Sequence, residues 1–109
     1  MTIQINSDKN LAVHEAFGDK LKDTLSDKLS RFSEHITRLE VHLSDENGSK
    51  EGIHDKRCMI EARFEGRQPV AATNHAGTYD QAVDGAIDKI KAVLDSAIGR
   101  VKDHHRHQV

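Results

Sequence analysis

One long amphipathic helix, predicted over residues 78–102, dictates much of what this chain can become. Its apolar residues recur three or four positions apart, at Tyr79, Ala82, Val83, Ala86, Ile87, Ile90 and Leu94. A helix with one apolar stripe is stabilised mainly by burying that stripe against another apolar surface. The other residues of the chain therefore have to provide such a surface.

Four further stretches have the pattern of β-strands. Residues 2–6, 38–44 and 56–65 alternate apolar and polar side chains, which is typical of strands with one buried face. Residues 69–73 are mostly small and begin with Pro69, which cannot donate a ladder hydrogen bond and so suits the start of a strand or an edge. Residues 45–55 are polar and contain Gly48 and Gly52, which predicts a mobile loop.

A second amphipathic helix is predicted over residues 11–34, with a stripe formed by Phe17, Leu21, Leu25, Leu29 and Phe32. The element order is therefore β-α-β-β-β-α, and the last three strands should be antiparallel neighbours joined by hairpins. Each helix has one apolar stripe and each strand one apolar face. The predicted fold is α+β, a four-stranded sheet with both helices packed on one face. We expect a single domain over 1–103 and a flexible histidine-rich tail over 104–109.

The composition argues against several classes of protein. The 109 residues carry a formal net charge of −2, whereas proteins that bind nucleic acid through non-specific charge are usually basic. A local basic patch remains compatible with that balance. Cys58 is the one cysteine, so an internal disulfide is impossible and a cytoplasmic location is expected. The sequence shows neither a signal peptide nor an apolar run of the roughly 20 residues that span a bilayer.

Two aspartates in the long helix could form a carboxylate pair for acid–base catalysis. Asp84 and Asp88 are four residues apart, but no histidine, cysteine or glycine-rich loop accompanies them at a suitable spacing. Asp88 also has Lys91 one turn further on as a simple ion-pair partner. We therefore expect no enzymatic activity and no small-molecule substrate.

The histidines and the cysteine also have simple structural interpretations. His104, His105 and His107 could bind a metal ion, but a frayed chain end cannot hold a closed set of ligands. Cys58 alternates in phase with Ile60, so a buried structural thiol is expected rather than a nucleophile. We expect no metal site and no cofactor.

The element order and several short motifs resemble the bacterial ribosome hibernation-promoting factors and ribosome-associated inhibitors, also called sigma-54 modulation proteins. In its second helix the family tends to have Tyr-x-x-Ala-(Ile/Val)-Asp followed by Ile-Asp-Lys-(Leu/Ile). The matching residues are Tyr79, Ala82, Val83, Asp84, Ile87, Asp88, Lys89 and Ile90. The run "KLSRF" at 28–32, followed by "ITRLEVHLS" at 36–44, is similar to the family's passage from the first helix into the second strand. The likeness spans about residues 1–102, and residues 43–73 look like a short-form branch of the family.

This resemblance implies a non-enzymatic RNA-binding protein that docks on the small ribosomal subunit. Family members lie in the channel for messenger and transfer RNA and keep idle ribosomes from translating under stress or in stationary phase. They contact ribosomal RNA through basic residues on the two helices. The matching positions are Lys28 and Arg31 on the first helix and Lys89 on the second.

Two positions depart from the family's pattern. Ala92 and Ser96 stand where basic residues are usual, and we expect Lys91, Arg100 and Lys102 to contribute charge from neighbouring turns. The chain ends soon after the second helix, so we do not expect the additional domain with which long-form relatives pair ribosomes. The oligomeric state is left open by these patterns.

The alternative is a regulatory module of the same fold that binds a basic protein through acidic residues. In the long helix, Asp84, Asp88 and Asp95 lie on one flank of the apolar stripe, and Lys89 lies on the other. If RNA is the partner, we expect it to meet the basic flank together with the basic residues of the first helix. The acidic flank should then face away.

Overall fold

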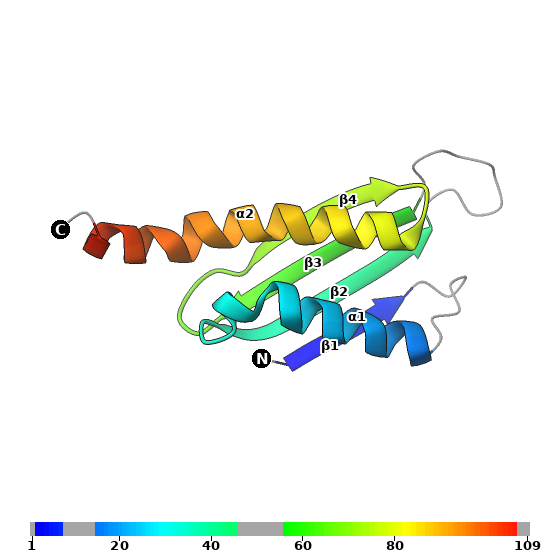
Figure 1. The fold of residues 1–109 in the computed structure, drawn as a ribbon, viewed down its shortest axis with the longest axis horizontal. Helices are drawn as coiled ribbons and strands as arrows, with labels where there is room; N and C mark the ends of the chain where they lie inside the picture. Colours follow the sequence, from blue (N-terminus) through cyan, green and yellow to red (C-terminus); the bar gives the residue numbers. More distant parts are fainter. Residues whose placement is uncertain (1, 8–14, 46–55, 107–109) are drawn as a thin grey trace.

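The computed structural model describes residues 2–7, 15–45 and 56–106, with side chains described over 2–7, 17–45 and 56–97. The predicted order β-α-β-β-β-α is confirmed (Figure 1). The elements are β1 (Thr2–Ser7), α1 (Glu15–Lys28), a 3-10 turn η1 (Ser30–Phe32), β2 (Ile36–Asp45), β3 (Lys56–Phe64), β4 (Val70–Ala76) and α2 (Tyr79–Arg106). Apart from Asp45, the loop expected over 45–55 lies outside the described residues. Of the expected tail, residues 107–109 also lie outside them.

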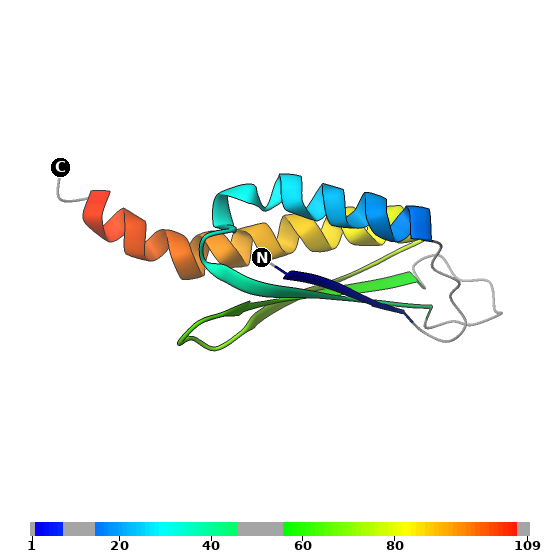
Figure 2. The same ribbon diagram turned by 90° about the horizontal axis from the view of Figure 1, so that it is seen from below.

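The four strands form one mixed sheet in the order β1-β2-β3-β4. The antiparallel pairing of β2, β3 and β4 is confirmed. β1 is parallel to β2, because the segment containing α1 carries the chain back along the sheet before β2 begins. Figure 2 shows α1 and α2 on the same face of the sheet. The predicted α+β arrangement, with both helices on one face, is confirmed.

The core lies between this helix layer and the sheet. Every buried side chain among the described ones is hydrophobic, Cys58 included. α1, η1 and the residue between them contribute Leu21, Leu25, Leu29 and Phe32; β2 and β3 contribute Ile36, Leu39, Val41, Leu43, Cys58, Ile60 and Ala62; α2 contributes Ala82, Val83, Ala86, Ile87, Ile90 and Leu94. Burying one leucine or isoleucine is worth about 1.5–3 kcal/mol, so the two helical stripes hold the helices on the sheet.

β2 begins two residues earlier than the alternating pattern predicts because it contains an irregularity. Its register with β3 shifts between Ile36 and Arg38, and Thr37 Oγ1 donates to the Arg63 carbonyl oxygen over 3.1 Å. The shift allows Ile36 and Leu39, three positions apart, to be buried together. A strict period of two places these residues on opposite faces.

α2 approaches β4 closely at Gly85. Asn74 Nδ2 donates to the carbonyl oxygens of Gln81 and Ala82, each at 3.3 Å, so the amide lies against the helix backbone. A Cβ atom on residue 85 would lie 2.0 Å from Asn74 Nδ2. Glycine destabilises a helix interior by about 1 kcal/mol relative to alanine. This close approach explains why a glycine is present there.

Replacing Gly85 with alanine is expected to lower the free energy of unfolding by about 1–2 kcal/mol, although alanine is the better helix former. The new methyl group displaces the Asn74 amide and breaks both of its hydrogen bonds to α2. Chemical denaturation measures the effect. In an Asn74→Ala background the same change should be neutral or stabilising, since the clash is absent. An equal loss in both backgrounds would contradict the close-contact explanation.

Candidate nucleic-acid interface

Lys28 and Arg31 are positioned at the end of the first helical segment by the buried residues beside them. α1 ends at Lys28, and η1 follows before the chain enters β2. Leu29 and Phe32 are buried, which leaves Lys28 and Arg31 at the surface. The guanidinium carbon of Arg31 lies 4.6 Å from the centroid of the Phe32 ring. This cation–π contact restricts where the Arg31 side chain can point.

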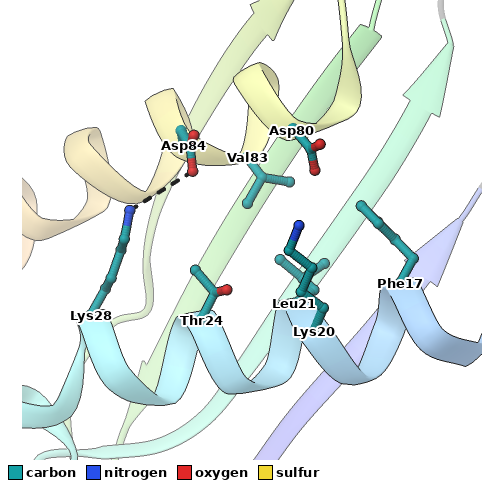
Figure 3. Close-up of a pocket in the computed structure, with 8 residues that line it drawn as sticks. All are labelled: Phe17, Lys20, Leu21, Thr24, Lys28, Asp80, Val83 and Asp84. Carbon is teal, nitrogen blue, oxygen red and sulfur yellow. Dashed lines mark ion pairs between the residues drawn. The ribbon is translucent and has the colours of Figure 1, made fainter.

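Both cations are paired with aspartates of α2. Lys28 Nζ lies 3.8 Å from Asp84 Oδ1, and Figure 3 shows this pair joining the two helices. Arg31 Nη2 donates to Asp95 Oδ1 in a second ion pair, further along α2. The four side chains are 43–64% exposed, so each pair is solvated and stabilises the fold by at most about 1 kcal/mol.

The acidic flank of α2 therefore lies beside α1 and η1, whereas the sequence analysis expected the basic flank to lie together with Lys28 and Arg31. Asp84 and Asp95 lie beside Lys28 and Arg31. Helical periodicity defines the two flanks of the stripe, but it does not say which flank lies next to α1. The packing of the two helices on the sheet decides that.

Lys89 lies on the opposite flank of α2, over β4. Its Nζ donates to the carbonyl oxygen of Thr73 at 3.2 Å, so the side chain extends toward the edge of the sheet. The structure thus separates Lys89 from Lys28 and Arg31, which the sequence analysis had grouped with it. Lys89 stays exposed, and a ligand that reaches it has to contact a different side of the helix layer.

The three remaining predicted basic residues also lie in α2. Lys91 is half-buried and stands four residues before Asp95, in the helical row that faces α1. It is therefore the α2 residue best placed to join Lys28 and Arg31. Arg100 and Lys102 belong to α2, but their side chains lie outside the described ones.

A groove between α1 and α2 has an apolar floor and charged walls (Figure 3). Its volume is about 370 Å³, and its lining consists of Phe17, Lys20, Leu21, Thr24, Lys28, Asp80, Val83 and Asp84. The lysines come from α1 and the aspartates from α2, so the two walls have opposite charge. A phosphate group that approaches the groove is attracted by the α1 wall and repelled by the α2 wall.

The face of the sheet opposite the helices carries a charge network that the sequence analysis did not single out. Glu40 contacts Arg38 Nε at 3.2 Å, Arg63 Nε at 3.3 Å and His42 Nε2 at 3.6 Å. Glu61 lies opposite Glu40 in the register and contacts Arg63 Nη2 at 3.1 Å. The arginines offset the repulsion between two glutamates on neighbouring strands. In the sequence, the only indication of this network was that positive and negative side chains alternate along β2. Which residues of β3 face them is known only from the cross-strand register.

Cys58 is a buried structural thiol in β3. Its side chain is 0% exposed, and burial raises its pKa from 9.0 to about 12, against a smaller lowering influence of Arg57. Since the thiolate is the reactive form, we expect folded protein to resist an aromatic disulfide reagent near neutral pH. The same thiol should react once denaturant unfolds the chain. Stoichiometric labelling of the native protein would contradict this prediction.

Neither a metal site nor a membrane span is found in the part of the chain that the structure describes. Over these residues, no three His, Cys, Asp or Glu side chains are grouped so that they could hold a metal ion. His104, His105 and His107 are not among the described side chains. No helix in the same part is long and apolar enough to cross a bilayer.

A family model described as sigma 54 modulation protein / S30EA ribosomal protein matches residues 3–102. The chain belongs to this family. Its structure is similar to the N-terminal domain of Protein Y from Thermus thermophilus, with 21% sequence identity, a TM-score of 0.68, and coverage of 88% of this chain and 98% of that one. It is also similar to a ribosomal subunit interface protein from Coxiella burnetii, with 15% identity, a TM-score of 0.69, and coverage of 91% and 99%. No curated protein matches the chain in sequence.

Membership of the S30EA family confirms the resemblance expected from the sequence. It makes the chain a ribosome-associated factor rather than an enzyme. At their low identities, the two solved structures establish a shared fold.

Asp84, one of the two aspartates considered above as a catalytic carboxylate pair, forms an ion pair with Lys28. This contact accounts for its presence in the helix without a catalytic role.

Proposed function

We propose that this protein binds the small ribosomal subunit and prevents translation by idle ribosomes in the cytoplasm, under stress or in stationary phase. It would lie in the channel for messenger and transfer RNA and contact ribosomal RNA. Membership of a ribosomal protein family supports this proposal. The names of the two similar structures, Protein Y and a ribosomal subunit interface protein, agree with a ribosomal partner.

The observation that carries the proposed contact is the placement of Lys28 and Arg31 on one exposed rim of the helix layer. Both side chains are more than two-fifths exposed, and both project from segments anchored in the core by Leu29 and Phe32. Lysine and arginine at fixed positions can meet backbone phosphates of a structured RNA without reading its base sequence. Lys91 extends this rim from α2. Lys89 would contact RNA separately from the rim, and Arg100 and Lys102 of α2 would contribute further positive charge.

The second candidate function is that of a regulatory module that binds a basic protein. The aspartates of α2 are the observation that supports it. The exposed side chains of Asp80, Asp84, Asp88 and Asp95 give this helix an acidic row. Two of them, Asp84 and Asp95, are already paired with cations of the first helical segment. That pairing occupies the cations as much as the aspartates, so it does not separate the two candidates. Membership of a ribosomal protein family is the reason that we favour RNA.

Co-sedimentation of the purified protein with small ribosomal subunits tests the proposal. We expect binding at low salt that weakens steeply at moderate salt, because contacts with RNA phosphates release counterions. Large subunits serve as the control for non-specific association with ribosomal RNA. Equal binding to both subunits, or no binding to either at low salt, would contradict the proposed function.

A further inference from the structure

We propose that Asp84 and Asp95 are specificity-determining residues, which act as internal competitors of RNA phosphate at Lys28 and Arg31. This inference rests on the proposed function and names residues that set its selectivity. A carboxylate and a phosphate offer a guanidinium or ammonium group the same kind of anionic acceptor. In the free protein, the two aspartates hold the positions beside the cations that RNA phosphates would take.

The geometry makes this competition direct. Lys28 Nζ and Asp84 Oδ1 are 3.8 Å apart, and Arg31 and Asp95 are joined by a hydrogen-bonded ion pair. Asp84 and Asp95 are eleven residues apart in α2, or about 16 Å along the helix axis. The two pairs would therefore engage different phosphates of one RNA.

The pairs are exposed enough to be opened by an incoming RNA. All four side chains are 43–64% exposed, so opening a pair does not leave a charge buried without a partner. The dense negative charge of an RNA strand is a stronger competitor than a single carboxylate. The displaced aspartate, however, stays attached to α2 next to the bound phosphate and repels it.

This repulsion selects among RNA partners. When a short, flexible RNA contacts the rim alone, its phosphates are attracted by Lys28 and Arg31 and repelled by Asp84 and Asp95 at the same time. A structured RNA that also contacts other parts of the domain can offset the repulsion with those additional contacts. The aspartates thus weaken binding to arbitrary RNA. This selectivity arises from a repulsive interaction that only a structured RNA partner can offset. The net charge of −2 agrees with a design that avoids non-specific binding.

Double-mutant cycles test whether the aspartates compete with RNA or only tie the helices together. One cycle uses Lys28→Gln, Asp84→Asn and their combination, and the other uses Arg31→Gln, Asp95→Asn and their combination. A further variant combines Asp84→Asn with Asp95→Asn. Each is titrated with a short oligouridine at low salt, and melting temperatures show that each variant is folded. Asp19→Asn with Asp23→Asn is the matched control, because these exposed aspartates of α1 change the net charge equally and lie outside both ion pairs.

We expect Asp84→Asn with Asp95→Asn to strengthen oligouridine binding about tenfold, and clearly more than the control. Lys28→Gln should weaken binding at least about threefold more in the Asp84→Asn background than in the unmodified protein, since the lysine is then released for phosphate. Additive effects in both cycles, or a gain no larger than that of the control, would overturn the inference. Binding of the unmodified protein to small subunits is measured in parallel, and its absence would instead overturn the proposed function.

Discussion

Reversing two charges together, as Lys28→Glu with Arg31→Glu, is expected to abolish binding to the small ribosomal subunit. Each change replaces an attraction to phosphate with a repulsion, and like charges placed against each other across an interface cost several kcal/mol. We expect a loss in affinity of at least about 100-fold, which corresponds to about 2.7 kcal/mol. Co-sedimentation and a direct titration with small subunits measure it.

The fold should persist in this variant. Both side chains are exposed, and the pairs that they form with Asp84 and Asp95 are solvated. The loss of two such pairs and of the contact between Arg31 and Phe32 is expected to lower the free energy of unfolding by about 1–3 kcal/mol. Circular dichroism should show an unchanged spectrum at room temperature.

A control with the same change in net charge separates a local contact from general electrostatics. Lys22→Glu with Arg67→Glu changes two exposed cations outside the rim formed by Lys28 and Arg31. This variant should retain most of its binding. If it loses as much affinity as the rim variant, the interaction depends on net charge rather than on a site. If the rim variant binds normally, Lys28 and Arg31 do not contact the subunit.

Truncating Leu25 to alanine is expected to lower the free energy of unfolding by about 2–5 kcal/mol. Leu25 is 0% exposed in the middle of the α1 stripe, between Leu21 and Leu29. Its loss leaves a cavity between α1 and the sheet that the neighbouring aliphatic side chains fill only in part. For a domain of this size, the melting temperature should fall by about 10 °C or more.

Ser26→Ala is the matched control for this substitution. Ser26 follows Leu25 in α1 and is exposed, so its change should move the stability by no more than about 0.5 kcal/mol. Chemical denaturation of both variants gives the comparison. Similar small effects at the two positions would show that α1 is not packed through its leucine stripe.

The sequence alone determined the order of the elements and the two-layer arrangement. The periods of the apolar pattern are local properties of the chain, near four in the two helices and two in the strands. Each pattern also marks the side that has to be buried, as Leu25 in α1 and Val41 in β2 show. A single sheet with both helices on one face is the economical way to bury those sides.

Two local deviations from these patterns are explained only by contacts between segments that are distant in the sequence. Ile36 joins the core because the register shifts against β3, and the sequence near Ile36 carries no sign of that shift. Gly85 interrupts a good helix sequence because Asn74, eleven residues earlier, places its amide against α2. Both features depend on a partner strand or helix whose position is fixed only in the folded chain.

Only the tertiary structure decided how the candidate site is assembled. The sequence identified Lys28, Arg31 and Lys89 as a group and placed Asp84 and Asp95 on a separate flank of α2. In the fold, that acidic flank contacts the end of α1 and η1, while Lys89 extends over β4. The physical reason is that periodicity orders residues around one helix axis, whereas the neighbour of each flank depends on strand order and on the direction in which each helix crosses the sheet.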